Sequence, residues 1–209
     1  MKTIQNWSKF NEMRAEVYQS AAKKLKKMGH ESKAKRLEEH PAFLSSLKYS
    51  GEPFSFTTGD LNLSGKFIGT DPGATYDMFC DNEKEMIDIP CFFLMSDEEG
   101  NTGDFSPIWI SAEIEDGEPT NIILIEPQNF EDTPWSDEIE EHSEAILFNN
   151  VKDARRFLKI LKEDFSGWED LKEHLIKLGR FEEEKTDFEE ALAMYKKLVN
   201  KLNVKMFYR

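Results

Sequence analysis

Cysteine is scarce in this sequence, which contains only Cys80 and Cys91, and long apolar runs are missing. Two thiols in a chain of this length exclude a disulfide framework and are typical of a reducing compartment. The longest apolar runs, at residues 90–95 and 122–125, are far shorter than the roughly 20 residues that cross a bilayer. The first residues also lack the apolar segment of a secretory signal peptide. We therefore expect a cytoplasmic protein.

Positive charge is nearly absent from the middle of the chain. Residues 51–150 contain 24 Asp and Glu, opposed only by Lys66 and Lys84, which gives this region a net charge of -22. Residues 1–50 have a net charge of +6 and residues 151–209 of +2, for a total of -14. A dense negative field attracts cationic partners and repels nucleic acid. The charge distribution therefore favours a protein partner with a basic surface and argues against nucleic acid.

Motifs for catalysis and cofactor binding are missing as well. The sequence contains no G-x-x-x-x-G-K or G-x-G-x-x-G phosphate loop, no G-x-S-x-G nucleophile elbow and no H-E-x-x-H zinc motif. The acidic stretch at residues 96–104 superficially resembles a calcium loop. Counted from Asp97, however, Thr102 and Ile108 stand where an EF-hand needs Gly and Glu. We predict no catalytic residue, no metal site and no cofactor, which favours a non-enzymatic protein.

The composition is that of one folded domain over residues 1–209. Apolar residues make up 39% of the chain and Phe occurs 16 times, which is enough to form a core. We predict a basic helical segment at residues 1–50, an acidic β-rich part at 51–150 and a helical part at 151–209. The fold class is α+β: an antiparallel sheet of about five or six strands over residues 54–148, flanked by the N-terminal helical segment and three C-terminal helices.

Several stretches in the middle of the chain have the length or the alternating pattern of strands. Strands are expected at residues 91–95, 108–115, 122–126 and 145–148. Asp116 and Gly117 predict the tight turn of an antiparallel hairpin between two of them. The tripeptide Asp71, Pro72 and Gly73 predicts a turn by its composition.

The C-terminal part has the three- and four-residue periodicity of helices. A helix over residues 151–164 is expected to bury Val151, Ala154, Phe157, Leu158 and Leu161. Ser166 with Glu169 predicts a capping box for a helix that ends at Gly179. Thr186 with Glu189 predicts another, for a helix running to about Leu202.

These observations predict an acidic binding protein that docks on a basic surface of another macromolecule, as a regulator, inhibitor or neutralising partner. A dense field of carboxylates steers association with cationic surfaces, and in its extreme form such a protein is a DNA mimic. Tryptophan is enriched at binding hot spots, so two Trp residues among the acids are the expected anchors. The predicted partner-binding residues are Asp97, Glu98, Glu99, Asp104, Trp109, Glu113, Glu115, Asp116, Trp135, Asp137, Glu138, Glu140 and Glu141.

Two other functions are compatible with the same sequence. The first is a metal-dependent hydrolase that uses scattered Asp and Glu side chains together with His142. The second is a structural or assembly subunit whose terminal helices pack against copies of the same chain. An acidic surface that only maintains solubility is the simplest interpretation of the charge.

Overall fold

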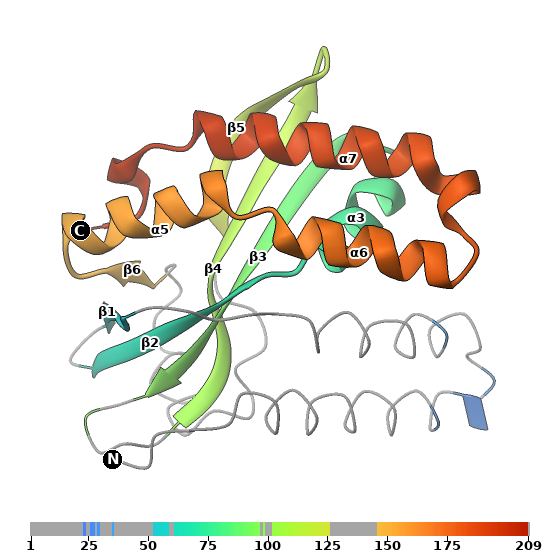
Figure 1. Ribbon diagram of the computed structural model, residues 1–209. Coiled ribbons are helices and arrows are strands. Elements are labelled where there is room, and N and C mark those ends of the chain that lie inside the picture. The colour runs from blue at the N-terminus through green and yellow to red at the C-terminus, as the bar shows by residue number, and fades with distance from the viewer. Residues whose placement is uncertain are drawn as a thin grey trace.

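The computed structural model describes residues 52–58, 61–96, 98, 102–125 and 146–208, together with Lys23, Lys26, Lys27, Gly29 and Lys35. Within these ranges, three C-terminal helices cover one face of a six-stranded antiparallel sheet (Figure 1). The predicted α+β class is therefore confirmed. The predicted basic helical segment at residues 1–50 is not borne out, because almost all of it lies outside the described residues.

The sheet is an antiparallel meander that a short last strand extends at one edge. Its strand order is β5-β4-β3-β2-β1-β6, so β5 and β6 form the two edges of the described sheet. The strands predicted at residues 91–95 and 108–115 lie within β3 and β4, which are both longer than expected. The strands are β1 (Phe54–Thr58), β2 (Leu61–Thr70), β3 (Met86–Ser96), β4 (Thr102–Glu115), β5 (Glu118–Ile125) and β6 (Leu147–Phe148).

The hairpin between β4 and β5 turns where the sequence predicts it. Asp116 and Gly117 both have positive φ, 51° and 73°, as a two-residue type I′ turn requires. Glu115 pairs with Glu118 across the turn. Further along β5, Asn121 has a φ of 47° and the register shifts, which marks a β-bulge.

A helix that the sequence does not predict, α3 (Pro72–Asp81), connects β2 to β3. The Asp71 carboxylate accepts a hydrogen bond from the Ala74 backbone N–H at 3.0 Å, and Pro72 stands at the first helical position. Asp and Pro favour helix N-termini as strongly as they favour turns. The turn predicted at Asp71, Pro72 and Gly73 is therefore wrong, since these residues begin a helix.

The C-terminal helices are α5 (Val151–Glu163), α6 (Ser166–Lys177) and α7 (Phe181–Lys201), followed by the short 3-10 helix η1 (Val204–Met206). Ala154, Phe157, Leu158 and Leu161 are buried as predicted, whereas Val151 is 36% exposed at the first position of α5.

Neither predicted capping box exists. Ser166 is the first residue of α6, and its N–H and hydroxyl both donate to the Asp164 carboxylate, at 3.0 and 2.7 Å. Helix α7 begins at Phe181, so Thr186 lies inside it. Phe165 and Arg180 stand at the N-cap positions of α6 and α7, and neither makes a side-chain capping hydrogen bond.

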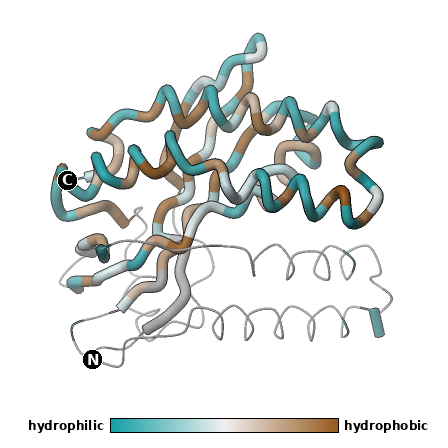
Figure 2. Tube along the Cα trace, viewed as in Figure 1, coloured by the Kyte–Doolittle hydropathy of each residue, from teal (hydrophilic) through white to brown (hydrophobic). Residues whose placement is uncertain are grey.

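An aromatic core lies between the sheet and the helices. Phe157 of α5 packs on Phe93 of β3, with ring centroids 5.8 Å apart, and Phe207 packs on Phe157 at 5.5 Å. Hydrophobic and hydrophilic positions alternate along the helices in Figure 2, as amphipathic helices on a sheet require. The buried phenylalanines of this core include Phe54, Phe56, Phe67, Phe93, Phe148, Phe157 and Phe207.

Candidate functional site

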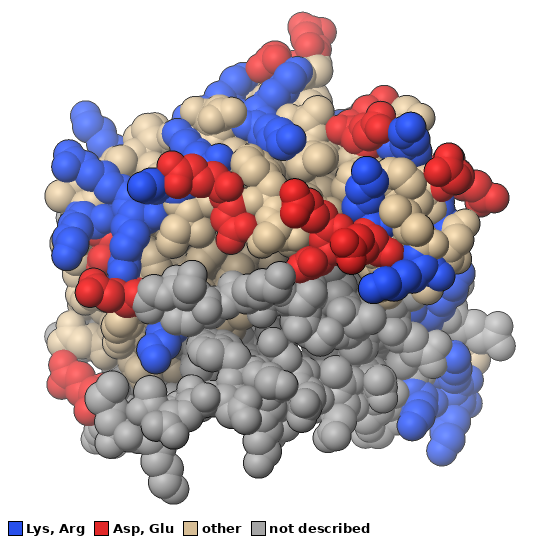
Figure 3. Space-filling model, viewed as in Figure 1, with Lys and Arg blue, Asp and Glu red and all other residues tan. Residues whose placement is uncertain are grey.

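The β4–β5 hairpin carries a group of exposed acidic side chains. Glu113, Glu115 and Asp116 lie at the end of β4 and in the turn, and all three are exposed. Acidic residues gather at the tip of this hairpin, which projects at the top of Figure 3. The Glu113 carboxylate accepts a hydrogen bond from the Asn121 amide of the β5 bulge. No described residue forms an ion pair with Glu113, Glu115 or Asp116.

Two lysines of α7 hold the other strand of the hairpin. Lys197 Nζ lies 2.9 Å from Glu118 Oε1, and Lys201 Nζ lies 2.8 Å from Glu118 Oε2. Each ammonium also donates to the backbone: Lys197 to the Gly117 oxygen at 2.6 Å and Lys201 to the Pro119 oxygen at 3.0 Å. Hydrogen bonds from Lys201 and Lys197 lower the pKa of Glu118 to about 2. The turn is therefore anchored to the helix layer, and one of its acids is neutralised.

The structure places the other described candidate acids far from this turn. Glu98 is exposed and accepts a hydrogen bond from the Asn62 amide at 3.1 Å. Asp104 lies near the start of β4, opposite Leu94, at the other end of the strand from Glu115. At about 3.3 Å per residue, the strand between Asp104 and Glu115 spans up to roughly 35 Å. Glu98 and Asp104 therefore do not belong to the hairpin group.

The remaining candidates lie outside the described residues, and no position is assigned to them. They are Asp97, Glu99, Trp135, Asp137, Glu138, Glu140 and Glu141. His142, the residue considered for a hydrolase, lies outside them as well.

Trp109 lies on the face of β4 that points away from the helices. Its neighbours Ile108 and Ile110 are fully buried toward the core, and side chains alternate between faces along a strand. Trp109 itself is half-buried. Its indole N–H is buried and finds no acceptor in the described part of the chain. This tryptophan is thus less accessible than a freely exposed anchor.

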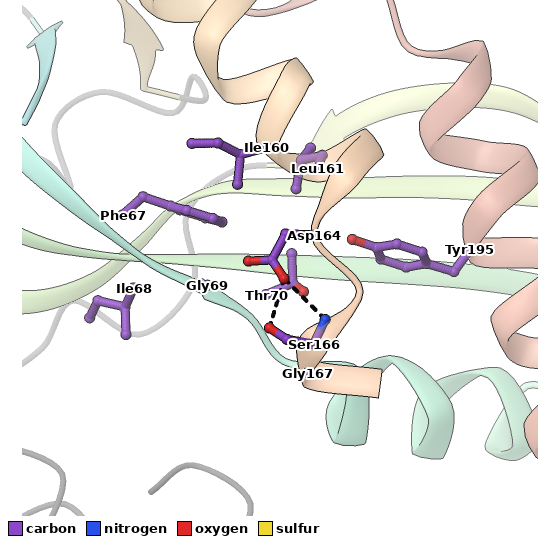
Figure 4. A pocket seen from close by; sticks show the side chains of 10 residues that line it. All are labelled: Phe67, Ile68, Gly69, Thr70, Ile160, Leu161, Asp164, Ser166, Gly167 and Tyr195. Atoms are coloured by element: carbon purple, nitrogen blue, oxygen red, sulfur yellow. Dashed lines mark hydrogen bonds between the residues drawn. The ribbon is translucent and has the colours of Figure 1, made fainter. Parts of the chain in front are cut away.

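A small cavity lies where β2, the α5–α6 junction and α7 meet (Figure 4). Its volume is about 30 Å³, which accommodates a water or two rather than a metabolite. The Tyr195 hydroxyl points toward Thr70 and Asp164 across it. Burial raises the pKa of Tyr195 well above its ordinary value, so the phenol stays neutral. Asp164 Oδ1 accepts from both the N–H and the hydroxyl of Ser166, so this carboxylate holds the junction between α5 and α6.

Polar contacts also join α3 to α7. The Tyr76 hydroxyl donates to Glu184 Oε2 at 3.0 Å, and Arg180 Nε lies 2.5 Å from Glu184 Oε1. Lys84 Nζ, just beyond α3, lies 2.8 Å from Asp187 Oδ1 and 2.5 Å from Glu190 Oε2. The contacts of Tyr76 and Lys84 fix α3 on the helix layer, which is a structural role.

The two cysteines do not provide a reactive thiolate. Burial, followed by the nearby Asp187 charge, raises the pKa of Cys80 to about 11. Cys91 is fully buried, and burial raises the pKa of its thiol further. A thiol with a raised pKa is a weak nucleophile and a weak metal ligand at neutral pH.

Comparison with known protein families, with curated proteins and with solved structures finds no match to this chain. Across the described residues, no group of three or more His, Cys, Asp or Glu side chains is placed to hold a metal ion. None of the described helices combines the length and the apolar character that a membrane span needs. The candidate site therefore rests on the geometry of the β4–β5 hairpin.

Sequence reasoning missed the lysines that anchor this hairpin. Lys197 and Lys201 are spaced i,i+4 on α7, so they share one side of the helix, which is a local signal. Their partner Glu118 is about 80 residues earlier, and Lys197 reaches the Gly117 oxygen over a separation of 80. No local pattern relates two positions so far apart.

Proposed function

We propose that this chain is a non-enzymatic binding protein that docks through the acidic tip of its β4–β5 hairpin on a basic surface of a partner protein. One observation carries the proposal: Glu113, Glu115 and Asp116 are exposed together on one hairpin. Lys197 and Lys201 anchor the turn of this hairpin to α7. A turn whose backbone is held in place loses less conformational entropy when a partner binds. The carboxylates also steer a cationic partner toward the tip before contact.

The edge strand supplies an apolar surface beside these charges. Ile123 of β5 is 57% exposed and lies opposite Ser111 of β4. Protein interfaces commonly combine an apolar centre with a charged, solvent-accessible rim. An acidic tip next to an exposed isoleucine fits a regulator or inhibitor that covers a basic patch. A carboxylate array that imitates nucleic-acid phosphates would be the extreme form of this function.

The test measures binding of a fluorescently labelled Lys- and Arg-rich peptide to the full chain by anisotropy. The hairpin variant Glu113→Gln, Glu115→Gln, Asp116→Asn should bind about tenfold more weakly, since three charge contacts are removed. Affinity for the unchanged chain should also fall as salt screens the carboxylates.

The matched control removes the same charge from the helices, with Glu173→Gln, Glu183→Gln and Glu189→Gln, all exposed positions. It should bind the peptide almost as tightly as the unchanged chain. Equal losses in both variants would show that net charge alone governs binding, and the assignment to the hairpin would be wrong.

A further inference from the structure

Helix α5 carries a stripe of positive charge along one side. Lys152, Arg155, Lys159 and Lys162 follow one another at steps of three and four residues, so they share one side of the helix. Lys205 of η1 adds a fifth cation, because η1 packs against α5. These five residues are called the basic stripe. Lys and Arg gather over α5 and the C-terminal end, at the left of Figure 3.

Three cations of the basic stripe have no side-chain partner among the described residues, whereas Lys162 donates to the Leu202 backbone oxygen at 3.3 Å. Lys152, Arg155 and Lys205 are exposed and form no ion pair or hydrogen bond through their side chains with any described residue. Lys159 reaches Glu163 only at 4.0 Å, and both side chains are mostly exposed. The helix's other acid, Asp153, is turned inward, where it accepts hydrogen bonds from the Ser55 backbone N–H and from Arg156. Among the acids of α5, only Glu163 contacts the stripe, through its exposed pair with Lys159.

Part of this arrangement is unfavourable for the helix itself. Lys152 lies in the first turn of α5, where the helix dipole favours acids. Arg155 and Lys159 are i,i+4 neighbours of like charge, which destabilises a helix. The two ends of α5 otherwise follow the favourable pattern, with Asp153 in the first turn and Lys162 in the last. Lys152, Arg155 and Lys159 thus bring like charges together on an exposed side of the helix at a local cost, which points to a functional constraint.

We propose that the basic stripe docks an acidic segment of a partner protein, with carboxylates spaced to meet cations one helical turn apart. Successive residues of the stripe on α5 have Cβ atoms about 5–6 Å apart along one side of the helix. Val151, 36% exposed at the start of α5, offers an apolar contact beside them. This inference goes beyond the proposed function, because α5 and the β4–β5 hairpin present opposite charges and need different partners.

A short acidic segment fits the stripe better than nucleic acid does. The chain has a net charge of -14, so a long polyanion that reached the stripe would also meet strongly negative surface. A short segment contacts the stripe alone, and charges more than about 8 Å away are screened at physiological salt. The stripe also contains no aromatic side chain on which a base could stack.

The experiment measures binding of a labelled glutamate-rich peptide to the full chain by fluorescence anisotropy at low ionic strength. The stripe variant Lys152→Gln, Arg155→Gln, Lys159→Gln should bind the peptide about tenfold more weakly. The control Lys172→Gln, Lys177→Gln, Lys185→Gln removes three exposed charges from α6 and α7 and should change affinity about twofold at most. A single-stranded oligonucleotide of equal charge should bind more weakly than the peptide.

A charge-conserving variant separates charge from packing. Lys152→Arg, Arg155→Lys, Lys159→Arg should retain peptide binding, and the thermal midpoint of the Gln variant should stay level or rise because like charges are removed. Equal loss in the α6–α7 control, tighter binding of the oligonucleotide, loss of binding in the charge-conserving variant, or no binding by the unchanged chain would each overturn the proposal.

Discussion

Lys197 joins the last long helix to the turn of the acidic hairpin: its ammonium lies 2.9 Å from the Glu118 carboxylate and donates to the Gly117 carbonyl at 2.6 Å. With Lys201 bound to the other Glu118 oxygen, one carboxylate is held by two cations. Such an exposed contact contributes modestly to global stability but restricts the local motion of the hairpin.

Replacing Glu118 with Gln should therefore loosen the hairpin without unfolding the protein. The backbone amides of β4 and β5 near the turn should exchange with deuterium severalfold faster, while those of β2 and β3 should be unchanged. Hydrogen exchange read by mass spectrometry or NMR checks this. Glu115→Gln is the matched control, because Glu115 has no ion pair with a described residue. Equal exchange rates in all three proteins would contradict the anchoring role.

The same contact predicts a pH dependence of stability. Hydrogen bonds from Lys201 and Lys197 lower the pKa of Glu118 from its ordinary 4.5 to about 2. Because the folded-state pKa is depressed, the contribution to the free energy of unfolding is complete above about pH 4.5 and is lost as pH falls through about 2. Denaturant titrations of the unchanged chain and Glu118→Gln should converge across this interval. A constant difference between them would argue against this linkage.

Phe157 is expected to be essential to the core. It is fully buried and packs on rings from β1, β2, β3 and β6 as well as on Phe207. Phe157→Ala should lower the free energy of unfolding by about 3–5 kcal/mol through lost burial and the cavity left behind. Val151→Ala, at an exposed position of the same helix, should change it by about 0.5 kcal/mol or less. Chemical denaturation measures both, and similar losses would contradict the described core.

The helix starts are testable by paired alanine substitutions. Asp71→Ala removes the cap of α3 and should lower the free energy of unfolding by about 0.5–2 kcal/mol. Thr186→Ala should be neutral or slightly stabilising, because Thr186 is exposed inside α7 and Ala is the better helix former. A clear loss of stability in Thr186→Ala would instead place a helix start there.

Thiol alkylation provides a further measurement. With the pKa of Cys80 raised to about 11, its thiolate fraction at neutral pH is low, and iodoacetamide should react with it up to about 100-fold more slowly than with a free thiol. Cys91 should react only after unfolding, because it is fully buried. Time-resolved mass spectrometry distinguishes the two sites. Rapid labelling of either thiol in the folded protein would contradict their placement.

The sequence predicted those parts of the fold that local patterns specify. Apolar and polar residues alternate at positions 108–115, and Asp116 and Gly117 favour a backbone with positive φ. These two signals were enough to predict the β4–β5 hairpin. Helix α3 was missed because Asp71 and Pro72 favour a turn and a helix start alike. The start of α7 was misplaced because its true first residues, beginning at Phe181, have no side-chain cap, whereas Thr186 resembles one.

The candidate site was predicted only in part, for a related reason. The charge count identified Glu113, Glu115 and Asp116, which share one hairpin. It could not separate them from Asp104, because a strand places residues close in sequence at opposite ends of a long element. It also could not reveal that α7 anchors the turn, since that contact depends on the tertiary fold.

The contacts of Lys197 and Lys201 with the start of β5 affect association between copies of the protein. β5 is an edge of the described sheet, and an uncovered edge invites another strand to add by backbone hydrogen bonding. Here Pro119 has no N–H to offer, and its carbonyl already accepts from Lys201, as the Gly117 carbonyl does from Lys197. The start of this edge is therefore closed to strand addition, which protects the protein from aggregating through it.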